Sequence, residues 1–133
     1  MSRLTIYLGR LIGLFLLIAA LSMILDPDSM IEMATALVDD RALLLIVGLI
    51  SLGIGLAIVV GHNVWSGGLL PILITLFGWS QLLRGLALLL LPAETQVAFF
   101  QVMRLEDLFY VYAGIPLVIG AYLTYAGFTS RYP

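Results

Sequence analysis

Four long apolar runs, each long enough to cross a bilayer as a helix, constrain this chain more than any other feature of its sequence. They cover roughly residues 4–25, 42–60, 69–91 and 108–128. A membrane-spanning α-helix needs about 20 consecutive, predominantly apolar residues. Because lipid offers no hydrogen bonds, the backbone groups of these runs must bond within their own segment, which predicts helices. We therefore expect an all-α fold, an integral membrane four-helix bundle in a single transmembrane domain.

The composition favours the same environment. Hydrophobic residues make up 62% of the chain and charged residues only 11%, and a soluble domain of 133 residues would expose aggregating apolar patches. The net charge of −2 leaves no basic surface for nucleic acid. The chain contains no Cys, which excludes disulfides, iron–sulfur clusters and thiol catalysis by this chain alone.

The charged residues predict the topology. All eight acids lie in the first and third connections or at the adjoining helix ends: Asp26, Asp28, Glu32, Asp39, Asp40, Glu94, Glu106 and Asp107. The opposite side carries Arg3, Arg10 and Arg131 and no acid. Basic residues favour the cytoplasmic side of a membrane, and here the bias is three against two, Arg41 and Arg104 being on the acidic side. We expect both termini and the 61–68 loop in the cytoplasm.

The two acidic connections share a pattern. Pro27 and Pro92 each follow an apolar run, and proline both ends a helix and starts a new one well. Ser29 and Glu32 have the spacing of a capping box. We expect short amphipathic helices over about residues 29–38 and 93–103, lying at the outer membrane surface. An ordered polar loop is the alternative.

The similarity of the connections suggests a tandem duplication, with repeats of about 1–65 and 66–133. At an offset of 65 residues three Gly or Pro pairs match: Gly13 with Gly78, Pro27 with Pro92, and Gly55 with Gly120. Each repeat would be a helix, an interfacial helix and a second helix. Parallel repeats occur in transporters, but also in bundles that transport nothing.

Small residues predict where the helices pack. Two seams stand out, one of Gly48, Ser51 and Gly55 and one of Ala113, Gly120 and Gly127. Close backbone approach supplies contact energy between helices in lipid. We expect the second and fourth spanning helices to meet at the centre of the bundle through these seams, with dimerisation between chains as the competing use.

Arg84 lies inside the third apolar run, where an ionisable side chain is expensive and marks a candidate site. Gln81 is three residues away on the same helical face. We expect Arg84 to pair with Glu106 or Asp107 near the top of the fourth helix. The alternatives are a site for an anion or lipid headgroup, and an Arg that faces lipid or a partner.

The 61–68 hairpin holds His62, the only histidine. A metal or haem site needs more ligands than one His, and neither Cys nor carboxylate lies on that side. We expect Gly61 to end the helix, Asn63 to cap backbone groups and Trp65 to anchor at the interface. The alternative is a cytoplasmic docking loop formed by His62, Asn63 and Trp65.

Nothing in the sequence has the pattern of a catalytic site. Ser66 lies near His62, but no acid follows on that side to orient the base. The glycines form no phosphate-binding loop. The acidic face could attract cations or a basic partner, although a solvated rim explains it as well. We therefore expect no enzymatic activity and no cofactor.

Three short stretches carry a resemblance to known proteins: Gly61-His62-Asn63-Val64-Trp65, Leu76-Phe77-Gly78-Trp79 and Leu82-Leu83-Arg84-Gly85. With them the chain resembles a group of short four-helix bacterial inner-membrane proteins that share the His-Asn-Val-Trp hairpin. The resemblance implies a bacterial inner membrane and the same architecture, and it brings no activity with it.

Three functions fit these expectations. The first is a non-enzymatic accessory or scaffold subunit that packs against a membrane protein partner, or against itself, through small-residue faces. The second is a small transporter or channel with a polar site at Arg84 and Gln81. The third is a lipid- or quinone-binding protein that uses Arg84 or His62 as its polar group.

Overall fold

The computed structural model describes residues 2–131 and is all-α, as expected. The described residues form six helices, four long ones and the two short ones that the sequence predicts in the acidic connections: α1 Arg3–Leu25, α2 Pro27–Asp39, α3 Arg41–Gly61, α4 Leu69–Leu90, α5 Ala93–Met103 and α6 Phe109–Thr129. Of these, α1, α3, α4 and α6 are long and apolar enough to cross a membrane. This property indicates a multi-pass membrane protein. The shorter helices α2 and α5 lie in the two acidic connections.

The start of α2 differs from the sequence expectation. Asp26 is the N-cap residue, and its Oδ1 accepts a hydrogen bond of 3.2 Å from the backbone N–H of Ser29. The capping box that the sequence predicts between Ser29 and Glu32 is therefore wrong. Pro27 is the physical reason, because its fixed φ suits the first helical position and the helix begins two residues before Ser29.

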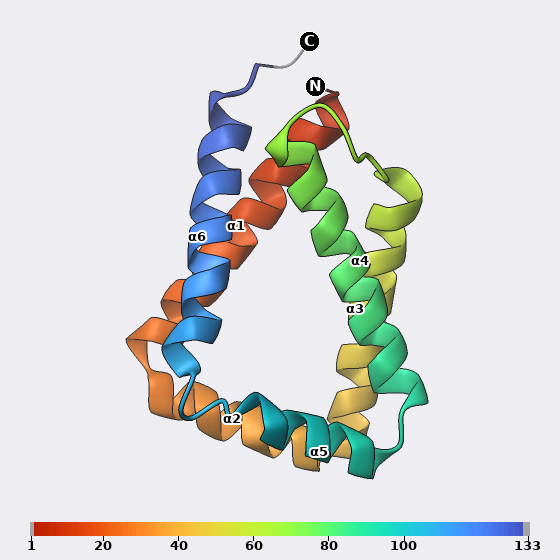
Figure 1. Cartoon of the computed structure of the whole chain (residues 1–133), viewed down its shortest axis with the longest axis vertical. Coiled ribbons are helices and arrows are strands. Elements are labelled where there is room, and N and C mark those ends of the chain that lie inside the picture. Colours follow the sequence, from red (N-terminus) through yellow and green to blue (C-terminus); the bar gives the residue numbers. More distant parts are fainter. Residues whose placement is uncertain (1, 132–133) are drawn as a thin grey trace.

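The four long helices form two pairs (Figure 1). One pair is α1 with α6 and the other is α3 with α4. The pairs converge at the end that carries the start of α1, the 61–68 loop and the last turn of α6, which we call the narrow end. They diverge toward the other end, the wide end, where α2 and α5 lie across the gap and contact each other.

The small-residue seams lie inside the pairs and not between α3 and α6. A Cβ atom on Gly55 of α3 would collide with the backbone of Leu82 in α4. A Cβ atom on Gly120 of α6 would lie 2.6 Å from the backbone nitrogen of Leu17 in α1. The expectation that α3 and α6 meet at the centre of the bundle is therefore wrong. Glycine permits close packing, but its presence does not identify the helix that packs there.

A small apolar core joins the two pairs near the narrow end. Its buried members come from all four long helices: Ile12, Ile58, Leu70, Ile74 and Leu123. Partly buried residues extend this core along α1 as far as Leu16 and along α4 as far as Phe77. Beyond these positions the pairs diverge (Figure 1). The second halves of α1 and α4 therefore lie outside the core that holds the pairs together.

Candidate functional site

Arg84 lies on the side of α4 that faces the other pair. Leu70 and Phe77 precede it by fourteen and seven residues, so the three residues share one stripe of the helix. Leu70 and Phe77 pack in the core between the pairs. Gln81 continues the neighbouring stripe, seven residues after Ile74 of the same core. Arg84 and Gln81 therefore extend the core-facing side of α4 into the region where the pairs diverge.

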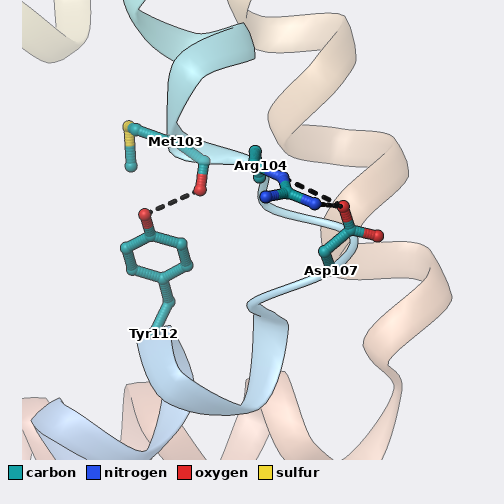
Figure 2. Close-up of polar contacts among 4 residues, drawn as sticks. All are labelled: Met103, Arg104, Asp107 and Tyr112. Carbon is teal, nitrogen blue, oxygen red and sulfur yellow. Dashed lines mark hydrogen bonds and ion pairs between the residues drawn. The ribbon is translucent and has the colours of Figure 1, made fainter.

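The expected ion pair between Arg84 and the acids before α6 is not formed. Arg84 is exposed and has no hydrogen bond or ion pair to any residue among 2–131. Asp107 instead pairs with Arg104, with 3.0 Å between its Oδ2 and the Nη2 of Arg104 (Figure 2). The structure thus brings Arg84 and Gln81 onto adjoining stripes of one helix but leaves both acids out of the site.

The same view shows how the segment before α6 is fixed. The Tyr112 hydroxyl donates a hydrogen bond of 2.7 Å to the carbonyl of Met103 (Figure 2). Arg104 adopts the left-handed conformation, with φ of 51°, where α5 ends. Together with the Arg104–Asp107 pair, these contacts give Asp107 a structural role in the turn. Asp107 is therefore engaged within this turn and not with Arg84.

Glu106 faces a different region. With Asp28, Glu32 and Asp39 of α2 it lines an open depression of about 720 Å³ at the wide end. Within residues 2–131 no three acidic or histidine side chains are arranged to hold a metal ion. The carboxylates give the wide end a strongly negative surface, against which only Arg41 and Arg104 are basic.

His62 is buried at the narrow end and ties three helices together. Its side chain is 2% exposed, and its Nε2 lies 2.9 Å from Oγ1 of Thr5 in α1. Its Nδ1 lies 3.3 Å from Oγ1 of Thr75 in α4. The Thr75 hydroxyl also accepts a hydrogen bond of 3.1 Å from the backbone N–H of Val64. Because the His62 side chain is buried and hydrogen-bonded inside the protein, it is not accessible to a docking partner. We therefore remove His62 from the candidate docking loop.

Sequence reasoning missed both threonines. Thr5 is 57 residues and Thr75 is 13 residues from His62, and nothing local links the three positions. The available signal was chemical, since a hydroxyl inside an apolar run needs a hydrogen-bond partner. By this criterion Thr5 and Thr75 each need a partner, and His62, the only histidine, is a candidate for both.

The remainder of the hairpin is exposed and ordered by Asn63. Gly61 is the last residue of α3, as expected. Asn63 does not cap backbone groups: its Oδ1 accepts hydrogen bonds from the indole N–H of Trp65 at 2.8 Å and of Trp79 at 3.4 Å. Trp65 is 54% exposed. Asn63 and Trp65 therefore remain accessible members of the candidate docking loop.

Arg10 is a further residue whose role the sequence did not reveal. Its Nε donates a hydrogen bond of 2.8 Å to the carbonyl of Gly127, and its guanidinium lies 4.9 Å from the ring centre of Phe128. It thus satisfies a carbonyl in the last turn of α6, where the helix dipole also favours a cation. In the other pair, Oγ1 of Thr75 lies 3.3 Å from the carbonyl oxygen of His62. Thr75 lies 65 residues after Arg10, and His62 lies 65 residues before Gly127, so the two contacts are equivalent under the offset of the repeats.

One small-residue pair is left open. Gly53 and Ala57 of α3 are both exposed and four residues apart, on the side of the helix away from Gly55. No atom of another helix lies within 4 Å of where a Cβ atom on Gly53 would be. Gly114 of α6 is open in the same sense. The helix pairs therefore do not use all of their small residues internally.

Comparison with known proteins adds no relative: no family model, curated protein or solved structure matches the chain.

Proposed function

We propose that this chain is a small non-enzymatic membrane protein that acts as an accessory or scaffold subunit. The observation that carries the proposal is the open Gly53–Ala57 pair on α3. Small residues four apart let a second helix approach closely, which is the main source of association energy in lipid. The occupant is a transmembrane helix, either of a partner protein or of a second copy. The seams that the sequence suggested for this contact are used inside the pairs.

The placement of polar groups supports binding over transport. Thr5, His62 and Thr75 are buried at the narrow end, where the His62 ring is hydrogen-bonded to both threonines. Arg84 and Gln81 lie on the far side of the apolar core from this cluster. An aqueous path between the two ends would have to cross Ile12, Ile74 and their neighbours, which offer no polar lining.

We further propose a bacterial inner membrane, with both termini in the cytoplasm and with α2 and α5 at the outer surface. The Arg residues of the narrow end and the acids of the wide end support this orientation. Because the chain has no Cys, variants with a single introduced Cys can test this orientation. An impermeant maleimide added to spheroplasts should label Asp28→Cys directly and Ser66→Cys only after permeabilisation. The reverse pattern contradicts the orientation.

We also propose that the two halves arose by tandem duplication. Gly55 meets the backbone of Leu82, and Gly120 meets the backbone of Leu17, with partners 65 residues apart in both cases. The offset that matches Gly and Pro in the sequence thus also matches contacts. Under this proposal the first helix of each repeat packs against the last helix of the other repeat.

Association is tested on purified protein in a mild detergent, with its mass measured by light scattering and native mass spectrometry. The expected result is a stoichiometric complex, with a partner or with itself, that Gly53→Ile abolishes. Gly114→Ile is the matched control, since it adds the same side chain at another open glycine. A wild-type chain that purifies as a monomer without a bound protein overturns the proposal. Equal association of the wild type and Gly53→Ile places the contact elsewhere and overturns it too.

A further inference from the structure

We propose that the diverging inner faces of the two helix pairs hold a zwitterionic phospholipid, with its phosphate on Arg84 and its ammonium group toward the acids of the wide end. The proposal rests on the membrane location given above and is independent of the association through Gly53.

The charge of Arg84 requires an anion that the chain does not supply. Its guanidinium has no partner among the described residues, and Asp107 is engaged by Arg104. An unpaired cation within a spanning helix is costly. Arg84 is six residues from the end of α4 at Leu90, or about 9 Å along the helix axis. An Arg side chain extends toward the membrane surface from such a depth, where lipid phosphates lie.

The stripe of α1 that corresponds to the Arg84 stripe of α4 is apolar. On α1 the core stripe of Ile12 and Leu16 continues to Ala19, the position that lies 65 residues before Arg84. Ala19 is partly exposed and Arg84 is exposed. Gln81 is the nearest further polar side chain along this side of α4. An occupant must therefore combine a phosphate-like head with an apolar tail, which describes a lipid and not a free anion.

The shape favours a lipid over a protein helix. At the narrow end Ile12, Ile74 and the other core residues pack the two pairs together. At the wide end α2 and α5 run from one pair to the other and contact each other (Figure 1). A transmembrane helix that lay along α4 between the pairs would have to pass both of these regions. Flexible acyl chains can enter sideways from the bilayer and need cross neither boundary.

The charge pattern selects the headgroup. Above the level of Arg84, the wide end carries all eight acids of the chain, and only Arg41 and Arg104 oppose them. A head with a second negative charge would be repelled by these carboxylates. A zwitterionic head places its phosphate on Arg84 and its positive end toward the acids. Phosphatidylethanolamine has this arrangement and also offers N–H donors to carboxylates.

The test is lipid binding to the full chain in mild detergent, measured by native mass spectrometry with three lipids of identical acyl chains. The expected order of affinity is phosphatidylethanolamine over phosphatidylglycerol over diacylglycerol. The phosphate should contribute about tenfold or more, the effect of a charge-assisted hydrogen bond. Arg84→Gln should bring phosphatidylethanolamine down to the level of diacylglycerol. Arg3→Gln, a change at an exposed Arg of the narrow end, should retain the wild-type order.

A second variant separates this site from an Arg that merely contacts surrounding lipid. Ala19→Phe adds a large side chain to the inner face of α1, at the position equivalent to Arg84, without altering any charge. It should weaken the binding of all three lipids, including diacylglycerol. Unchanged affinities in Ala19→Phe place the lipid outside the inner faces and overturn the proposal. So does equal binding of phosphatidylethanolamine by the wild type and Arg84→Gln. A wild type that prefers phosphatidylglycerol overturns the choice of headgroup. Thermal unfolding of each variant checks that it is folded.

Discussion

Two glycines of α3, two residues apart, differ entirely in what surrounds them. A Cβ atom on Gly55 meets the backbone of Leu82, which cannot move aside, whereas one on Gly53 meets nothing. Gly55→Ala should therefore destabilise the fold by about 1–3 kcal/mol through overpacking. Gly53→Ala should stabilise it by up to about 1 kcal/mol through helix propensity. Denaturant titration in detergent micelles measures both. Equal effects of the two changes would contradict the α3–α4 contact.

The hydroxyl of Thr75 has more hydrogen-bond partners than the hydroxyl of Thr5. Replacing Thr75 should therefore lower the stability of the hairpin more than replacing Thr5. Thr75→Val removes the acceptor for the Val64 N–H and one partner of His62. Thr5→Val removes a partner of His62 alone from this cluster. We expect Thr75→Val to cost about 1–3 kcal/mol and to accelerate hydrogen exchange of the Val64 amide. In Thr5→Val that amide should remain protected. Fast exchange in both variants would mean that the hairpin depends on His62 itself.

At the scale of a helix, α6 ends where Arg10 of α1 reaches its last carbonyls. The guanidinium donates to Gly127 and lies over Phe128. Arg10→Gln should loosen this turn by about 1–2 kcal/mol, because it removes a cation and its donors from a helix C-terminus. Faster exchange of the amides of residues 126–130 reports the change. Arg3→Gln, at an exposed Arg near the same end, should leave these amides as they are.

The long helices were predictable from the sequence and their pairing was not. The run of residues 42–60 predicts α3, Arg41–Gly61, within one residue at each end. Length and hydropathy suffice here, because lipid enforces a helix on any such run. Gly55 and Gly120 mark seams correctly as places of close contact. Which helix fills a seam depends on connections and shape that no local pattern records.

The candidate site was predictable in part for the same reason. Arg84 stands out because a charge inside an apolar run is visible in one dimension. That Asp107 pairs with Arg104 and not with Arg84 depends on the three-dimensional turn before α6, which no local pattern records (Figure 2). His62 was visible as the only histidine, but its burial between Thr5 and Thr75 required the three helices to be placed.

For the whole molecule, the central statement is that two helix pairs converge at one end and diverge at the other (Figure 1). In a regular four-helix bundle, which the sequence suggested, α1 and α4 would keep nearly the same spacing along their whole length. The apolar core that reaches Leu16 and Phe77 but not Arg84 is the structural basis of the divergence.

Spin labels in lipid nanodiscs test this shape most directly. The chain has no Cys, and equivalent exposed positions exist at each end of α1 and α4: Leu4 with Leu69, and Leu21 with Leu86. Double-Cys variants at these pairs are spin-labelled, and the distance between the two labels is measured by double electron–electron resonance. The mean distance should be clearly longer for Leu21–Leu86 than for Leu4–Leu69. Two equal distances would contradict the diverging pairs and, with them, the lipid site at Arg84.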